Sequence, residues 1–347
     1  MGALAIRAQF RELWWLTAAM LLVSALLSVQ FSSVCSKAQA LVWYRKGIRA
    51  FQRDDYGAAE TCWHIALKKS PYPHDGDLQY ALIEDWLGCS LSRRGLWDQA
   101  KDCYQEALSI QTRGTDHESL DVARSMNGLG YVYKEEGNCI ESENCYRIAL
   151  NIRQSRLGSH QDTATSLNNL AGLYVMLHRF KDAEPLLNKA LDMDRKLLGA
   201  RSEVVLKLEG NLAQLKEETG ELFQAQHSYE RILAEMQDSQ RNPSASFIAE
   251  CLNNLGVTYQ LEGRLVDAER SCRRAIDISK AIYGINSPTT ADYMSNLAGI
   301  LVDEGRRSEA RDLYRLAIDI DTVSLKTGHP ITELIKSNLA HLYVRTH

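Results

Sequence analysis

The chain of 347 residues is poor in proline, with six residues, and it carries no excess of positive charge. Since 45% of its residues are hydrophobic, the composition excludes both a disordered chain and a collagen-like fibre. Its net charge is −4, and no local cluster of basic residues stands out along the sequence. We therefore expect no nucleic-acid partner.

The sequence also lacks the motifs of the common catalytic and metal sites. It contains no HExxH, GxSxG or phosphate-loop motif, and none of its eight cysteines is spaced as CxxC or CxxH. Its nine histidines are scattered. These absences predict no catalytic residues, no metal site and no cofactor.

A charge-free stretch near the amino terminus differs from the rest of the chain. Residues 13–29 follow Arg7 and Arg11, and the next charged residue after Glu12 is Lys37. A bilayer could accept such a segment as a helix. The cytoplasm is therefore not the expected location of this protein.

Two interpretations of this segment remain open beside a merely buried helix. The tripeptide Ala38-Gln39-Ala40 matches the small-x-small pattern of signal peptidase sites, and cleavage after Ala40 would make residues 1–40 a secretory signal. Without cleavage, residues 13–36 would associate with the membrane as an anchor. The protein is expected to be exported in the first case and membrane-anchored in the second.

From residue 41 onward the chain repeats itself about every 42 residues. The segments 166–191 and 251–276 align without a gap, and so does the segment 294–318. One small residue recurs at steps of 41 to 43 residues, at Ala59, Ala100, Ser142, Ala183, Ala225, Ala268 and Ala310. A regular period of this length is typical of solenoid proteins, which stack one structural unit on the next.

Each unit has the composition of a helical hairpin. Its first half contains Leu-Gly or Leu-Ala, and its second half contains alanines on either side of an aromatic or aliphatic residue. Small side chains at fixed helical positions let two helices approach closely. A glycine between the two halves predicts a turn with a left-handed backbone, at Gly95, Gly137, Gly220, Gly263 and Gly305.

With these features the chain resembles the tetratricopeptide repeat family, and more closely the long repeats of kinesin light chains. Their pattern is LNNLAxLY, a glycine turn and AExLxxxAL, and residues 166–191 read SLNNLAGLYVMLHRFKDAEPLLNKAL. The resemblance covers residues 41–347 as one repeat domain. It implies an all-α fold, a right-handed superhelical solenoid of antiparallel helix pairs, with about seven units and a closing helix over residues 331–343.

The resemblance also implies that the first helix of each unit lines a concave groove. The inward position just before the motif leucine is an asparagine in five successive units, at Asn169, Asn211, Asn254, Asn296 and Asn338. A carboxamide donates and accepts at once, so this row can hold the backbone of an extended peptide. Alternatively, each amide bonds to the neighbouring repeat and fixes the superhelical pitch, and some residues could do both.

Charged residues at the other inward positions differ between the two halves of the array. The first units carry Arg45, Arg93, Arg124 and Lys134 beside Asp85 and Glu135, and the later units carry Lys207 against Glu217, Glu218, Glu250, Asp292 and Asp303. The predicted groove therefore runs from basic to acidic, and would orient a ligand with its basic part towards the carboxy-terminal units. The alternative is an ordinary solvated helix face.

One aromatic residue interrupts the asparagine position. Trp86 stands there in the second unit, where it either stacks on a ligand or belongs to the core of a divergent terminal repeat. The predicted peptide-binding residues are the five asparagines together with Trp86, Arg93, Arg124, Glu217 and Glu250.

These observations predict a non-catalytic scaffold that binds a peptide or protein segment in the concave groove of the array. The alternatives are a subunit or regulator of an enzyme complex, and a purely structural spacer at a membrane. A motor-adaptor role is not expected, because no heptad coiled coil precedes the repeats.

Overall fold

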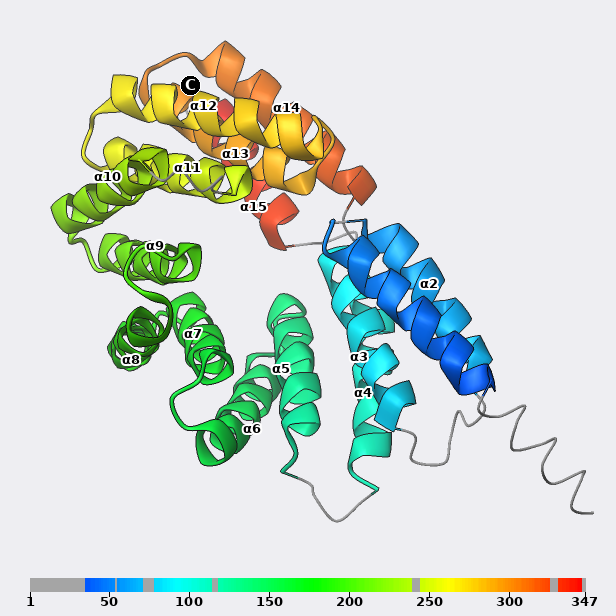
Figure 1. The fold of residues 1–347 in the computed structure, drawn as a ribbon. Helices are drawn as coiled ribbons and strands as arrows, with labels where there is room; N and C mark the ends of the chain where they lie inside the picture. The colour runs from blue at the N-terminus through cyan, green and yellow to red at the C-terminus, as the bar shows by residue number, and fades with distance from the viewer. Residues whose placement is uncertain are drawn as a thin grey trace, which may run out of the picture. The chain divides into compact units, whose positions relative to one another are not determined.

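The computed structural model describes residues 35–53, 55–70, 78–113, 118–238, 244–324 and 330–344. Within these ranges all regular structure is helical and no strand occurs. The chain divides between Ile152 and Arg153 into two compact units, called unit 1 and unit 2 below. Figure 1 shows how the helices follow one another as hairpins within each unit. The predicted all-α fold is confirmed.

Unit 1 begins with a helical stretch over residues 35–51, which we call the N-terminal helix. It continues with α2 (Tyr56–Lys69), α3 (Leu78–Arg93), α4 (Trp97–Gln111), α5 (Leu120–Glu135) and the first part of α6 (Cys139–Leu157). The fully buried Trp63 ring lies 6.0 Å from the rings of both Phe51 and Trp86. This aromatic group joins the N-terminal helix, α2 and α3.

Unit 2 contains the end of α6 and every helix that follows. These are α7 (Gln161–Met176), α8 (Phe180–Leu198), α9 (Glu203–Glu218), α10 (Leu222–Asp238), α11 (Ala245–Leu261), α12 (Leu265–Tyr283), α13 (Pro288–Asp303), α14 (Arg307–Ser324) and α15 (Pro330–Val344). Counted along the described chain, seven helix pairs precede α15. The expected closing helix over residues 331–343 is α15.

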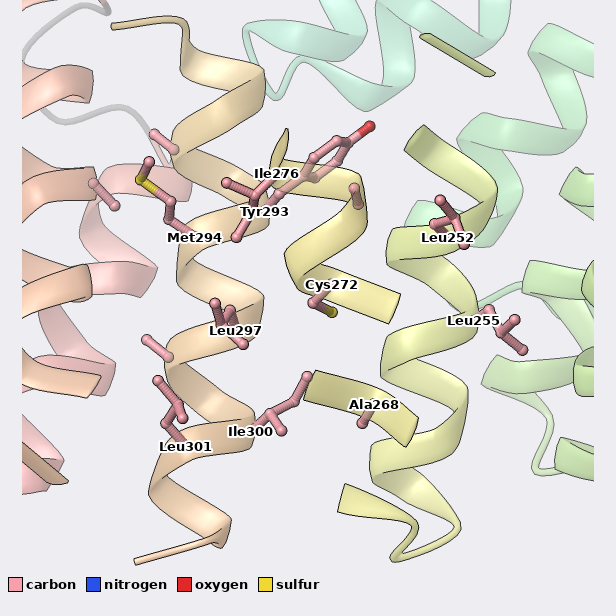
Figure 2. Packing of buried hydrophobic residues seen from close by; sticks show 14 of the residues in the cluster. Leu252, Leu255, Ala268, Cys272, Ile276, Tyr293, Met294, Leu297, Ile300 and Leu301 are labelled. Carbon is pink, nitrogen blue, oxygen red and sulfur yellow. The ribbon is translucent and has the colours of Figure 1, made fainter. Parts of the chain in front are cut away.

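The small residues of the repeat bring the two helices of each pair together. Ala183, Ala225, Ala268 and Ala310 have no exposed surface. In the pair α11–α12, a Cβ added at Gly256 would lie 2.4 Å from the Cys272 sulfur, so only glycine fits there. Figure 2 shows Leu252 and Leu255 of α11, Cys272 and Ile276 of α12, and Met294 and Leu297 of α13 in the same core. Each hairpin thus buries its apolar side chains against the next hairpin, as the repeat predicts.

The turns between the two helices of a pair confirm the glycine prediction. Gly95, Gly137, Gly220, Gly263 and Gly305 all have positive φ, between 71° and 83°. In the repeat built from α7 and α8, the same position is occupied by His178, with φ of 55°. A side chain in this left-handed conformation costs about 1 kcal/mol or more, a cost that glycine avoids.

We expect His178→Gly to raise the free energy of unfolding by about 0.5–1 kcal/mol, because relief of the left-handed strain exceeds the added entropy of the unfolded chain. The measurement is urea denaturation followed by circular dichroism. The matched control is Gly263→Ala, which should lower stability by about 1 kcal/mol. A loss of stability in His178→Gly would instead show that the ring contact with Phe180, 5.6 Å between centroids, dominates at this turn.

The predicted amino-terminal segment, residues 13–29, lies outside the described residues. The N-terminal helix extends across the predicted boundary at residue 40, where Ala40 is buried. No helix in the described part of the chain combines the length and the apolar character needed to cross a bilayer. The signal and anchor interpretations therefore both stay predictions.

Candidate functional site

The inner side of unit 2 is lined by the first helices of its repeats, α7, α9, α11, α13 and α15. Each of these helices contacts the next one, whereas the described second helices α8, α10, α12 and α14 make no comparable contacts with each other. The stack is therefore closer together on the side of the first helices, which makes that side concave. All five asparagines of the predicted row lie on these helices and are partly exposed.

Two members of the row form amide bonds between neighbouring repeats. Asn211 Nδ2 donates to Asn168 Oδ1 at 2.7 Å, and Asn296 Nδ2 donates to Asn253 Oδ1 at 3.1 Å. Both acceptors stand immediately before a row asparagine in the preceding repeat. The structural alternative raised from the sequence is thus observed at Asn211 and Asn296. Each of these side chains keeps a second N–H and its carbonyl oxygen for other partners.

Carboxylates stand beside the row on the same helices. We call Glu217, Glu250 and Asp292 the acidic wall. Burial raises the pKa of Glu250, which Lys207 counteracts, and burial together with Asp321 raises the pKa of Asp292 to about 7. Within the described chain, no lysine or arginine forms an ion pair with these three carboxylates.

The acidic wall is held in place by neighbouring polar groups. The Thr258 hydroxyl donates to Glu217, whose pKa is nevertheless raised by burial. The Lys207 ammonium lies 2.7 Å from Glu203, outside the acidic wall. The inner side of unit 2 therefore presents partly desolvated negative charge with little neutralisation, an environment that favours cations.

A pocket of about 350 Å³ lies at the α15 end of the asparagine row. It is lined by Gln260, Gly299, Val302, Asp303, Arg307, Tyr314, Asn338, His341 and Leu342. Gln260 Nε2 donates to Asp303 Oδ2 at 2.6 Å across neighbouring repeats. Asn338 thus borders a hollow large enough for a side chain, with both polar and apolar walls.

The site residues predicted in unit 1 occupy different environments. Trp86 packs edge-on against Phe51 at 5.4 Å and belongs to the aromatic core group, as the structural interpretation of this residue predicts. Arg124 forms ion pairs with Asp121 at 2.7 Å and with the buried Asp85 at 3.5 Å. Arg93 is exposed at the end of α3.

The inner charge of unit 1 is therefore more balanced than its sequence indicates. Lys134 lies 2.9 Å from Glu135 and 5.1 Å from the centre of the Tyr131 ring, so it too has an anionic neighbour. The acidic character predicted for the later units is clearer in the structure than the basic character predicted for the first ones.

Sequence reasoning missed the partners of the asparagine row. Asn168 and Asn253 complete the amide pairs, and the signal for them was the Asn-Asn doublet at 168–169 and 253–254. It also missed Glu209, only 5% exposed, which accepts from Arg195 at 2.5 Å and from Arg231 at 2.7 Å. Among the described residues, no group of histidine, cysteine and acidic side chains is arranged to hold a metal ion.

The repeated hairpins and the concave inner side define an α-helical repeat protein. A model of the tetratricopeptide repeat matches residues 79–155, 121–196, 162–238 and 247–322. The chain therefore belongs to the tetratricopeptide repeat family.

Two relatives and one solved structure illustrate this relationship. The Drosophila melanogaster "Tetratricopeptide repeat protein 19 homolog, mitochondrial" is 29% identical over 163 residues, which cover 46% of this chain and 43% of that protein. The Arabidopsis thaliana "Protein KINESIN LIGHT CHAIN-RELATED 1" is 28% identical over 252 residues, 69% of this chain and 39% of that protein. The chain thus spans less than half the length of either relative.

The solved structure is "NprR in complex with its cognate peptide NprX". It superposes with a TM-score of 0.59 at 17% identity, covering 76% of this chain and 72% of NprR. At this identity the likeness concerns the fold alone.

Proposed function

We propose that unit 2 is a non-catalytic scaffold that holds an extended, basic segment of a partner protein on its inner side. The observation that carries this proposal is the acidic wall beside the asparagine row, in which Glu217 and Asp292 are partly buried and Glu250 is exposed. Desolvation raises the pKa of all three carboxyls, and none of them has a lysine or arginine ion pair within the described chain. A cationic side chain would neutralise them and recover the free energy lost by their burial.

In this proposal the asparagine row binds the backbone of the partner segment, and the acidic wall binds its basic side chains. Carboxamides can bond to the N–H and C=O groups of an extended backbone without selecting its side chains. Among the described contacts, Asn254 and Asn338 donate no amide bond to the preceding repeat of the kind that Asn211 and Asn296 make. The Asn254 carbonyl accepts from Asn253 at 3.3 Å, which leaves its N–H groups for a ligand. The fold shared with NprR, whose solved complex contains a peptide, supports the same kind of ligand.

The proposed cellular location rests on the sequence of residues 13–29, which lie outside the described residues. The uncharged residues 13–29 would place this scaffold at a membrane or direct it to export. Residues 41–347 would then act as the repeat domain that receives the partner.

The test is fluorescence anisotropy with the full chain and the labelled probe peptide (Lys-Ala)5. We expect Glu250→Gln/Asp292→Asn to weaken binding at least 10-fold, because both substitutions remove charge while keeping side-chain shape. The fold should tolerate them, since burial already favours the neutral form of each residue. Wild-type affinity should rise between pH 6 and pH 8 as Asp292 ionises.

The matched control is Asp192→Asn/Asp319→Asn, which changes the net charge equally on exposed positions of α8 and α14. This control should bind the probe like the wild type. Equal weakening in both double variants would show a diffuse charge effect and overturn the proposal. So would equally tight binding of the probe (Glu-Ala)5.

A further inference from the structure

The N-terminal helix has two faces of very different composition. Its inner face is fixed in the core of unit 1, where a Cβ added at Gly47 would lie 2.2 Å from Trp63 Nε1, and where Trp63 Nε1 donates to the Tyr44 carbonyl at 3.2 Å. Ile48 and Phe51 pack into the same core. The helix is therefore held in one rotational setting about its axis.

The opposite face of this helix carries only apolar and basic side chains. At 100° per residue its members fall within about 140° of the helix circumference. They are Leu41, Val42, Arg45, Lys46 and Arg49, all of them exposed, and we call them the basic face; Arg53, also exposed, follows in the turn after the helix. Residues 35–53 contain no acidic residue, and the first ones follow at Asp54 and Asp55.

The cations of the basic face are not neutralised by the described part of unit 1. Arg45, Lys46, Arg49 and Arg53 form no ion pair with any described residue, and Lys46 Nζ lies 4.1 Å from the centre of the Trp43 ring. Asp55 is engaged as the N-cap of α2, where it accepts from the Ala58 N–H at 3.0 Å. Three positive charges thus stand on the exposed face of this helix, and Arg53 adds a fourth in the turn that follows it.

We propose that the basic face binds an anionic bilayer surface, with its cations on the lipid phosphates and Leu41 and Val42 among the headgroups. The charge complementarity requires an anionic partner, and the two aliphatic side chains, 37% and 54% exposed, favour a lipid interface over a nucleic acid. In the sequence, the uncharged residues 13–29 shortly precede this helix, so insertion of that segment would bring the basic face to the bilayer. Cleavage after Ala40 would leave every residue of the basic face on the chain. This inference is independent of the function proposed for unit 2.

The experiment compares binding of the full chain to vesicles of pure phosphatidylcholine and to vesicles with 30% phosphatidylserine, by sedimentation. The readout is the ratio of binding to the anionic vesicles over binding to the phosphatidylcholine vesicles, called the anionic preference. Apolar insertion of residues 13–29 contributes equally to both kinds of vesicle and therefore cancels in this ratio. We expect Arg45→Gln/Lys46→Gln/Arg49→Gln to lower this preference by roughly 100-fold. Leu41→Ser/Val42→Ser should lower binding to the anionic vesicles by about 10-fold.

The matched control is Lys189→Gln/Lys196→Gln/Arg201→Gln, which removes three exposed cations from unit 2. Its anionic preference should equal that of the wild type. An unchanged preference in the basic-face variant, or an equal loss in the control, overturns the proposal. A nucleic-acid partner would also overturn the proposal. Its signature is that a 20-base-pair DNA duplex binds more tightly than the anionic vesicles at the same salt, while Leu41→Ser/Val42→Ser changes neither the binding of DNA nor the binding of vesicles.

Discussion

Replacing Glu209 by alanine should lower the free energy of unfolding by about 3 kcal/mol. Glu209 is 5% exposed and joins three helices, because it accepts from Arg195 of α8 and from Arg231 of α10 while it belongs to α9. Its removal leaves two guanidinium groups without their shared anion. Both guanidinium groups are 42% exposed and can regain contact with water. The loss of unfolding free energy should therefore lie at the lower end of the range observed when one partner of a buried ion pair is removed.

The control for this prediction shares one of the same partners. Glu235 lies 3.2 Å from Arg231 in an exposed pair along α10, so Glu235→Ala should cost less than about 0.5 kcal/mol. Urea denaturation of both variants gives the comparison. Similar losses in the two variants would mean that burial of Glu209 adds nothing to its ion pairs.

The stability of unit 1 should decrease as the pH rises from about 4 to 7, because of Asp85. This carboxyl is 2% exposed, and burial raises its pKa to about 6, although Ser125, Arg124 and Gln111 oppose the shift. A raised pKa means that the folded state holds its proton more tightly than the unfolded state. Its contribution is therefore present below pH 4 and is lost as the pH passes 6, with a total of about 3 kcal/mol.

Asp85→Asn should remove most of this pH dependence and increase stability at pH 8. An asparagine can accept from Gln111 Nε2, now 3.2 Å from the carboxylate, and can donate to the Ser125 hydroxyl. Thermal unfolding between pH 4 and pH 8 measures the difference. Asp121→Asn, the control, removes the exposed partner of Arg124 and should leave the pH dependence unchanged. An unaltered profile in Asp85→Asn would exclude Asp85 as its source.

The fold was predictable because its determinants are periodic. The small residues and the turn glycines recur at nearly constant steps, so the helix pairs, their turns and α15 could be placed from the sequence. The asparagine row was predictable for the same reason. His178 shows the limit of this reasoning, since it takes the backbone conformation of a glycine without being one.

The charges were less predictable, because neutralisation depends on contacts that have no regular spacing. Arg124 was expected to be basic surface, but Asp85 from the preceding repeat and Asp121 from its own helix lie against it. Glu209 was missed because its two arginines are 14 residues before and 22 residues after it. The basic face of the N-terminal helix was not predicted. Arg45 was instead assigned to the inner side of the array, because the cations at residues 45, 46 and 49 come together on one face only when the segment is helical.

The regular stacking of the first helices along unit 2 fixes the spacing of the contacts that an extended strand lying across them can make. Neighbouring helix axes are about 10 Å apart, and a fully extended polypeptide advances about 3.3 Å per residue. One amide of the array therefore meets about every third residue of the bound strand. Because the acidic wall has one carboxylate on each of three neighbouring first helices, we expect partner sequences to carry lysine or arginine about every third residue. A peptide with this spacing should bind more tightly than the alternating probe (Lys-Ala)5.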